Sequence, residues 1–308
     1  MTEVIAYLIT VYAPNVAPNV GAARLLHKPM PSKLKLDEVG YWSEIKLEIL
    51  EKYAKPYTKI LRARHMRPIY IDGFAGAGRH AAKGSNRLID GSPVRALNVD
   101  PPFEAFHLVD IDGARTDELN RLSSGKPNVF VHLGDCNQVL RNEVFPEIDY
   151  AKYMRALCIL DPYGLHLDWE TIQAAGQSDV IEIFLNFPVM DMNMNVLWHN
   201  SDRVADTQKE RMTRFWGDDS WKRAAYPTTQ GLFGPMQEKA SNQDVADAFR
   251  ERLKKVAGFK YVPKPIAMRN TKGAIVYYLF FAAHQKTAGK IVEEILARYE
   301  HHGEVPHG

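Results

Sequence analysis

The sequence has 308 residues, of which 45% are hydrophobic and 25% charged, so the chain can bury a substantial core as an ordinary globular protein. Its 39 basic and 37 acidic side chains give a formal net charge of +2, which excludes a global field that attracts nucleic acid or anionic membrane and leaves a local basic patch open. The two cysteines, Cys136 and Cys158, form neither a disulfide framework nor a zinc pattern. We therefore expect two buried thiols, no metal site and a reducing cytoplasm.

The N-terminal residues 1–40 are expected to form an extension that precedes the main domain. The apolar run at residues 4–12 follows no Lys or Arg and is too short to span a bilayer, so it predicts an added strand that Pro14 and Pro18 end. Residues 21–35 are typical of a solvated connector. No later run is long enough for a membrane helix, so we expect no membrane association.

Hydrophobic periodicity predicts an alternation of helices and strands from residue 41 onwards. Apolar residues at helical spacing predict a helix over residues 41–63. Short apolar runs predict buried strands at residues 68–72, 106–110, 129–133, 156–160 and 180–186. Helical or loop-like segments separate them at residues 92–98, 114–122, 137–142 and 169–175. This alternation predicts an α/β fold with a parallel sheet and right-handed crossovers.

The second half of the chain is less regular. Residues 190–240 are expected to form a late insertion, which is either a substrate lid or a surface excursion. A helix is expected within it at residues 204–216. After it we expect helices at residues 242–256 and 287–299 and strands at residues 261–268 and 274–283. The two strands predict an antiparallel pair at the sheet edge. The expected domain is residues 41–300, with a tail at residues 301–308.

A glycine-rich turn follows the first predicted strand and is the candidate cofactor loop. Its residues are Asp72, Gly73, Phe74, Ala75, Gly76, Ala77 and Gly78. Small residues here let the backbone approach a ligand closely and adopt positive φ, although tight turns also use glycine for structural reasons alone. The acidic Asp72 favours S-adenosylmethionine, whose amino-acid end tolerates a carboxylate near its ammonium, over a dinucleotide.

The next two predicted strands also end in acidic residues. Asp110, followed by Ile111 and Asp112, is placed to accept hydrogen bonds from ribose hydroxyls; one of the two acids is expected to be a solvated turn residue, and we favour Asp110 as the binder. Asp135, followed by Cys136, is placed to bind the adenine amino group, or to cap the following helix, or both.

The fourth predicted strand ends in the sequence Asp161-Pro162-Tyr163-Gly164, the candidate catalytic turn. Amino-directed nucleic-acid methyltransferases carry a similar turn, (Asp or Asn)-Pro-Pro-(Tyr or Phe), and here one proline is missing. In such a turn the carboxylate binds the attacking amine and the aromatic ring stacks on a planar substrate. The same tetrapeptide is also a good β-turn. Asn186-Phe187-Pro188, after the fifth strand, either lines the same pocket or only ends the strand.

Several motifs together resemble the three-Cys-motif partner family. They are Tyr41-Trp42-Ser43 with Lys46, the Tyr70–Gly78 turn, Gly91-Ser92-Pro93, Gly134-Asp135-Cys136-Asn137, Leu160-Asp161-Pro162-Tyr163-Gly164 and the segment Val276–His284. The resemblance covers about residues 41–300. It implies a bacterial or phage protein with a Rossmann-like class I methyltransferase fold, encoded beside a partner protein that bears three cysteines.

The leading hypothesis is an S-adenosylmethionine-dependent methyltransferase that acts on an amino group of a nucleic-acid base. Its weak point is charge, because basic clusters such as residues 62–67 are few. The alternatives are methylation of a small molecule or a protein, and a catalytically silent module that binds the three-cysteine protein. A Mg²⁺-dependent nuclease that uses Asp72, Asp110, Asp135 and Asp161 is a further alternative.

Overall fold

A seven-stranded sheet is the centre of the computed structural model, which describes residues 38–39, 41–82, 88–231, 234–270 and 272–300. These residues all belong to one of the two units of the chain, residues 33–308. The strands are β2 (Arg67–Asp72), β5 (Ala105–Asp110), β6 (Val129–Leu133), β7 (Met154–Leu160), β8 (Ile181–Phe187), β11 (Ile266–Arg269) and β12 (Ile275–Ala282). Their order is β11-β12-β8-β7-β2-β5-β6.

The pairing directions confirm the predicted fold class. Strands β8, β7, β2, β5 and β6 are paired in parallel, whereas β12 is antiparallel to both β8 and β11. The expected antiparallel pair is therefore present at one edge, with β12 placed between β8 and β11. This is the mostly parallel sheet of a Rossmann-like class I methyltransferase fold.

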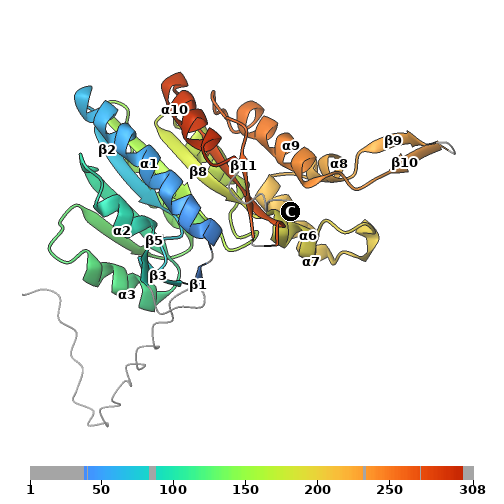
Figure 1. Ribbon diagram of the computed structural model, residues 1–308, viewed down its shortest axis with the longest axis horizontal. Coiled ribbons are helices and arrows are strands. Elements are labelled where there is room, and N and C mark those ends of the chain that lie inside the picture. The colour runs from blue at the N-terminus through green and yellow to red at the C-terminus, as the bar shows by residue number, and fades with distance from the viewer. Residues whose placement is uncertain (1–37, 40, 83–87, 232–233, 271, 301–308) are drawn as a thin grey trace, which may run out of the picture. The chain divides into compact units, whose positions relative to one another are not determined.

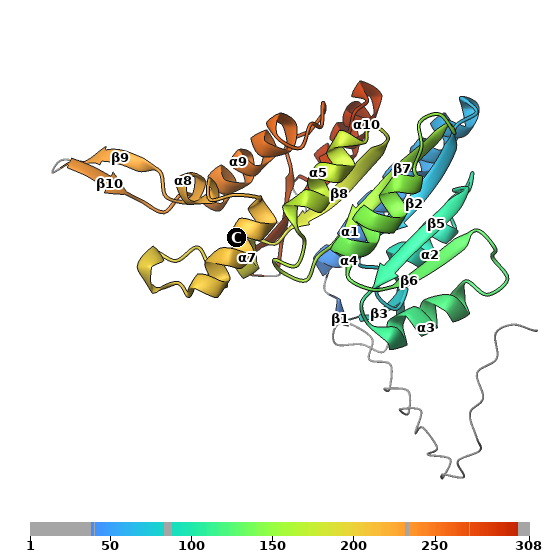
Figure 2. The same cartoon turned by 180° about the vertical axis from the view of Figure 1, so that it is seen from behind.

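Helices cover both faces of this sheet, which explains why its strands are apolar on both sides (Figures 1 and 2). One face packs against α1 (Tyr41–Ala63), α2 (Ser92–Leu97), α3 (Gly113–Leu122) and α10 (Lys286–Ala297). The other packs against α4 (Cys136–Val139), the π-helix η1 (Leu140–Val144), the 3₁₀-helix η2 (Phe145–Glu147), α5 (Trp169–Gln177) and α9 (Asn242–Lys255). Ser241 caps α9, because it forms a capping box with Asp244.

The strand order reverses beside β2, and this reversal positions the candidate site. From β2 the chain continues outwards to β5 and β6, then returns to β7 on the opposite side of β2. Asp72 lies level with Leu108 of β5 and Ile159 of β7. The turns that follow these three strands therefore meet at one crevice, where open α/β sheets bind their ligands.

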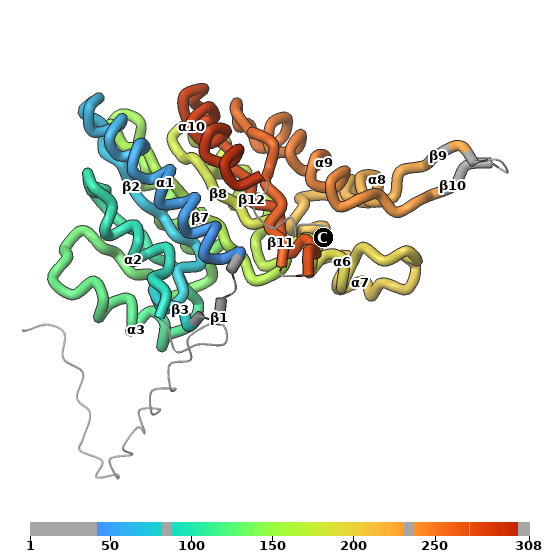
Figure 3. The backbone as a smooth tube through the Cα atoms, viewed as in Figure 1, coloured from blue at the N-terminus to red at the C-terminus, as the bar shows by residue number. Residues whose placement is uncertain are grey.

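The late insertion is built from short elements that pack against the main core. They are α6 (Val189–Asn195), the 3₁₀-helix η3 (Ser201–Arg203), α7 (Asp206–Trp216), α8 (Trp221–Ala225), β9 (Thr228–Gly231) and β10 (Gly234–Gln237). Figure 3 shows this segment extending from the β8 side of the sheet, away from β5 and β6. Phe215 and Trp216 are buried against Phe249 of α9, so the base of the insertion is part of the core.

The boundaries differ from the prediction where proline or short strands intervene. The strand expected at residues 261–268 begins only at Ile266, because Pro263 and Pro265 lack the amide hydrogen that a ladder requires. The short strands β1 (Glu38–Val39), β3 (Arg79–Ala82) and β4 (Leu88–Asp90) were not expected, nor was the β9–β10 hairpin. The strand predicted at residues 4–12, the connector at residues 21–35 and the tail at residues 301–308 lie outside the described residues.

None of the helices in the described ranges is both long enough and apolar enough to cross a membrane.

Candidate active site

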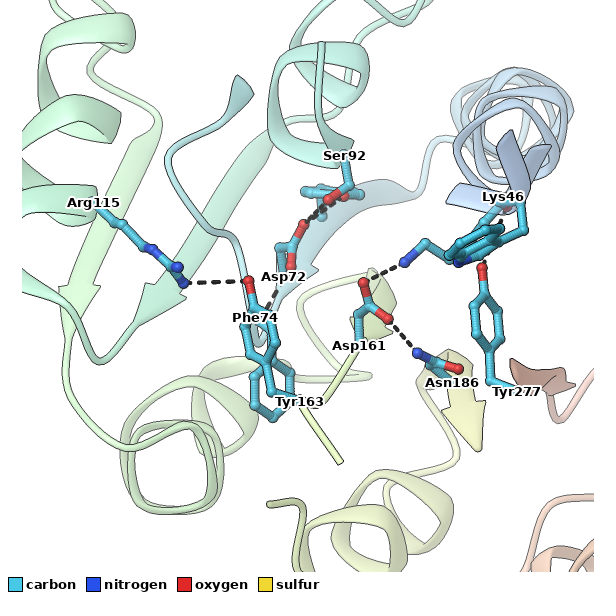
Figure 4. Close-up of polar contacts among 11 residues, drawn as sticks. Lys46, Asp72, Phe74, Ser92, Arg115, Asp161, Tyr163, Asn186 and Tyr277 are labelled. Carbon is cyan, nitrogen blue, oxygen red and sulfur yellow. Dashed lines mark hydrogen bonds and ion pairs between the residues drawn. The ribbon is translucent and has the colours of Figure 1, made fainter. Parts of the chain in front are cut away.

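Asp72, the last residue of β2, stabilises the start of the loop that follows this strand. The carboxylate is fully buried and accepts hydrogen bonds from the Ser92 hydroxyl (2.6 Å) and the Phe74 amide (3.2 Å) (Figure 4). The Tyr70 hydroxyl donates to it at 3.1 Å. Burial nevertheless raises the pKa of Asp72 to about 6, because removal from water disfavours the charged form. Asp72 lines neither of the two cavities described below, and its contact with a cofactor stays a prediction.

The glycines of this loop are required by space and by backbone conformation. A Cβ atom on Gly73 would lie 2.8 Å from Cys136 Sγ and 3.2 Å from both Leu140 and Leu160. Gly76 and Gly78 have φ of +63° and +75°, in the region that favours glycine. The loop is therefore packed closely against α4, and the amides of its first residues are hydrogen-bonded to Ile159, Asp72, Val109 and Asp110. Gly76 and Gly78 themselves line neither cavity.

Asp110 ends β5 and closes the loop from the other side. Its Oδ2 accepts from the Gly76 amide at 2.9 Å, and its Oδ1 accepts from the Asp112 amide at 2.9 Å. Arg115 Nη1 lies 3.8 Å from Oδ2. Asp110 is only 4% exposed, yet it lines a cavity. It therefore joins the glycine-rich loop to the ribose position expected from the sequence.

Two further acids behave as helix caps. Asp112 accepts from the amides of Ala114 (2.8 Å) and Arg115 (3.2 Å) at the start of α3. Of the two acids after β5, Asp112 is therefore the solvated cap and Asp110 the residue that faces a cavity. Asp135 caps α4 through the Gln138 amide (3.2 Å) and also lines the cavity, so both of its predicted roles are compatible.

The larger of the two cavities lies at the ends of β2, β5 and β6, and we name it the β5-side cavity. Its volume is about 520 Å³. Six of the predicted cofactor residues line it, namely Gly73, Phe74, Asp110, Ile111, Asp135 and Cys136. Ile111 is 73% exposed and offers an apolar surface, whereas burial raises the pKa of the Cys136 thiol and keeps it protonated.

The second cavity, of about 420 Å³, lies between the β7 turn, α1 and α6, and we name it the β8-side cavity. Its wall includes Lys46, Ala75, Asp161, Pro162, Asn186 and Tyr277. Phe74 and Tyr163 line both cavities. The candidate cofactor loop and the candidate catalytic turn thus form the boundary between two adjoining spaces.

Asp161 is held between a cation and an amide in the β8-side cavity. Lys46 of α1 forms an ion pair and hydrogen bond with one carboxylate oxygen, and Asn186 Nδ2 donates to the other at 2.7 Å (Figure 4). The Lys46 side chain is 11% exposed, and its ammonium lies 5.7 Å from the centre of the Tyr277 ring. Residues from three distant segments therefore fix the orientation of one carboxylate at the end of β7.

Tyr163 projects from the same turn and is 56% exposed. Arg115 Nη1 donates to its hydroxyl at 3.3 Å, and the Arg115 guanidinium lies 5.6 Å from the ring centre. Gly164, the next residue, has a φ of +67°, and a Cβ there would lie 2.7 Å from Asp191 Oδ2. A glycine is thus required at position 164, because α6 packs directly against it.

Some residues of this arrangement were missed or only partly anticipated. Asn186 and Pro188 line the β8-side cavity, which supports the pocket interpretation of that turn over simple strand termination. Lys46 was noted only within a family-like motif. A lysine between Ile45 and Ile49 on the apolar face of a helix was the available signal. Nothing in the sequence indicated that Tyr277 or Arg115 reaches the site.

The four acids proposed for a metal-dependent nuclease do not gather into a ligand set. In the described part of the chain, no group of three or more His, Cys, Asp or Glu side chains could hold a metal ion. Asp72 faces Ser92, Asp110 faces the loop amides and Asp161 faces Lys46. The nuclease hypothesis therefore gains no support from the geometry.

No protein-family model and no curated protein matches the sequence. The chain is similar in structure to a Legionella pneumophila protein from a family of unknown function, with 11% identity, a TM-score of 0.44 and coverage of 84% of this chain and 92% of that chain. It is also similar to a "putative methyltransferase" from Thermobifida fusca, with 14% identity, a TM-score of 0.40 and coverage of 79% of each chain. A complex of DhpI with S-adenosylhomocysteine gives 11% identity and a TM-score of 0.30, covering 78% and 96% of the two chains.

These scores are too low to carry an activity from one protein to another. The fold is established by the strand order and pairing of the chain itself, which form a Rossmann-like class I methyltransferase sheet.

Proposed function

We propose that the protein is an S-adenosylmethionine-dependent methyltransferase that acts on an amino group of a nucleic-acid base. The observation that carries the proposal is the position of Asp161 and Tyr163. Both belong to the turn after β7; Tyr163 lines both cavities, and Asp161 lines the β8-side cavity. Methyl transfer requires a cofactor and an acceptor side by side, and this junction provides the two adjoining spaces.

The β5-side cavity fits the cofactor by the chemistry of its lining. Asp110 offers a carboxylate for ribose hydroxyls, Ile111 an apolar surface for adenine and Asp135 an acceptor for the adenine amino group. Gly73 and Phe74 would place backbone atoms next to the amino-acid end. When bound, the cofactor supplies an electrophilic methyl group on a sulfonium.

The β8-side cavity fits an amine acceptor. Each oxygen of the Asp161 carboxylate can accept a second hydrogen bond besides the one from Lys46 or Asn186. An acceptor N–H directed at Asp161 would orient the nitrogen lone pair towards the methyl group. The nitrogen lone pair would form the bond to the methyl group that the cofactor gives up, and the proton that the nitrogen then releases would pass to Asp161 or water.

Tyr163 supports a planar acceptor over a flexible amine such as a lysine side chain. Its ring is exposed at the cavity wall, and Arg115 restrains its hydroxyl. A ring so placed can stack on a flat heterocycle while Asp161 binds the exocyclic amino group. Small planar amines share this chemistry, and they are the second class of acceptor to screen.

The three-cysteine partner is a separate proposal that comes from the sequence resemblance alone. Co-expression of the two proteins, followed by size-exclusion chromatography, tests it. Co-elution is expected, and separate elution of two folded proteins would contradict it. If the chain binds the cofactor but transfers no methyl group in either state, the catalytically silent module becomes the better description.

Transfer of label from methyl-labelled S-adenosylmethionine tests the proposed activity. The full chain is incubated with single-stranded DNA, RNA, free nucleosides and an unrelated protein, and Asp161→Ala serves as the control variant. Label is expected in nucleic acid with the wild type and to be lost with Asp161→Ala. Equal labelling by both proteins, or labelling of the protein acceptor only, would overturn the proposed role of the turn.

A further inference from the structure

Exposed apolar side chains continue outwards from the mouth of the β8-side cavity. Met190 (38% exposed) and Met194 (65% exposed) line the cavity from α6, and Trp198 (41% exposed) follows one turn later. We name these three residues the α6 rim. Met190, Met194 and Tyr163 line the proposed acceptor site, and the Trp198 indole is hydrogen-bonded to the Met194 carbonyl, so exposed apolar side chains gather at the mouth of this site.

Trp198 is held in place although its ring is exposed. Its indole Nε1 donates to the Met194 carbonyl at 2.9 Å, and its own carbonyl accepts from the Tyr226 hydroxyl at 2.7 Å. The other tryptophans differ: Trp169, Trp216 and Trp221 are buried, and Trp42 is half-buried. A restrained, exposed indole loses little entropy when a flat group stacks on it.

A cation without an acidic partner lies beside the rim. Lys239 Nζ donates to Asn193 Oδ1 of α6 at 2.8 Å, and within the described residues it makes no ion pair. Partial burial lowers the pKa of this lysine, and the missing counter-charge would be supplied by an anionic ligand. Arg211, which also lies near α6, is 3.6 Å from Asp191 and is thereby compensated.

We infer that the α6 rim binds the nucleotide next to the target base in a single-stranded nucleic acid, with the neighbouring base stacked on Trp198 and its phosphate near Lys239. This inference rests on the proposed function and narrows its substrate class to an unpaired strand. A base in a duplex has both faces covered by its neighbours, whereas an unpaired base offers a free face to an aromatic ring. Methionine side chains adapt to bases of different size.

The near-neutral net charge of the protein leads to a quantitative prediction of how binding depends on salt. Stacking, and not phosphate contact, would carry most of the binding. For a single phosphate contact, made by Lys239, the slope of log K against log salt should be about −0.7 on a single strand.

Fluorescence titration tests the inference, because Trp198 is the most exposed tryptophan; the same titration of Trp198→Ala separates its signal from that of Trp42, which lines the β8-side cavity. Short single-stranded DNA, the same sequence as RNA and the DNA duplex are titrated into the full chain with S-adenosylhomocysteine present. We expect the single strands to quench the fluorescence and to bind more tightly than the duplex. Trp198→Ala should weaken single-strand binding, measured by anisotropy of a labelled strand, by about 10-fold.

Phe130→Ala is the matched control, because Phe130 is also an exposed aromatic residue (48%) but lies on β6, at the far edge of the sheet. It should leave binding unchanged. Equal affinity of wild type and Trp198→Ala for the single strand, or tighter binding of the duplex, would overturn the inference. Calorimetry with S-adenosylhomocysteine alone distinguishes failure of the proposed function from failure of this inference. If the ligand does not bind, the proposed function is wrong, whereas the oligonucleotide titrations test the inference independently.

Discussion

Lys46 is the residue on which the chemistry of the acceptor site depends most. A lysine that is 11% exposed on the inner face of α1 gives up most of its hydration, and Asp161 and the Tyr277 ring replace it. Its ammonium neutralises Asp161 and holds one oxygen, while Asn186 holds the other. Lys46 therefore acts through Asp161 as a positioning residue.

Lys46→Met should lower the rate of methyl transfer by about 100-fold, because the Asp161 carboxylate loses its orientation and its counter-charge. Cofactor affinity should not change, since Lys46 does not line the β5-side cavity. Kinetics that separate kcat from KM, with calorimetry for the cofactor, measure both quantities. Lys52→Gln on the same helix, an exposed residue paired with Glu48, should change neither. An unchanged kcat in Lys46→Met would remove this role.

Gly164 tests the contact between the catalytic turn and α6. Gly164→Ala should destabilise the fold by more than the roughly 1–2 kcal/mol that a left-handed alanine costs, because its Cβ also meets the Asp191 carboxylate at 2.7 Å. Gly125→Ala is the matched control, with a φ of +78° and open space around the new methyl group. Urea unfolding of both variants gives the comparison. Equal losses of stability would show that Asp191 moves aside freely.

The sequence was most informative about residues that follow strands. Asp110, Asp135 and Asp161 are each placed by the end of a parallel strand, so locating the strands located them as well. Lys46, Arg115 and Tyr277 come from helices and from an antiparallel strand, and their approach depends on how those elements pack. No local pattern encodes that packing, which is why their contacts could not be predicted.

At the scale of elements, α1 and β8 share a buried polar contact. Glu182 of β8 points into the layer under α1, where the Tyr53 hydroxyl donates to it and Arg155 lies nearby. Burial raises the pKa of Glu182 to about 7, from 4.5. The folded protein therefore binds this proton more tightly than the unfolded chain does.

A raised carboxyl pKa gives stability at low pH that is lost as the pH rises. For Glu182 the loss should amount to roughly 2–3 kcal/mol between pH 5 and pH 8. Glu182→Gln keeps an acceptor for Tyr53 but has no charge to desolvate. Its free energy of unfolding relative to that of the wild type should therefore rise by about this amount from pH 5 to pH 8. Urea unfolding of both proteins at pH 5 and pH 8 measures it. A stability difference between the two proteins that does not vary with pH would contradict the assignment.

Helices and strands were predicted correctly from the sequence where the hydrophobic period extended over several residues. The helix at residues 41–63 and the strands β2, β5, β6, β7 and β8 follow apolar patterns that both faces of a covered sheet impose. The short hairpins β3–β4 and β9–β10 have no more than four residues per strand, too few to establish a period. Residues 190–240 were expected to form a lid or a surface excursion with one helix at residues 204–216, yet Met192, Phe215 and Trp221 pack into the core.

At the scale of the whole molecule, the strand order determines which turns lie next to one another. The reversal of strand order beside β2 brings the ends of β5 and β7 to opposite sides of one glycine-rich loop. The turn after β8 and the helix α6 then close the second cavity. A cofactor cavity and an acceptor cavity thus adjoin at Phe74 and Tyr163, and the central claim is that S-adenosylmethionine occupies the first of them.

Calorimetric titration of S-adenosylmethionine and S-adenosylhomocysteine into the full chain tests this claim most directly. Asp110→Asn keeps one acceptor for the loop amides but removes the charge at the ribose position. Asp112→Ser, a cap-preserving change two residues away, is the matched control. We predict binding of both ligands to the wild type and to Asp112→Ser, and binding at least about 10-fold weaker to Asp110→Asn. Absence of binding to the wild type, or equal affinity for all three proteins, would contradict the account.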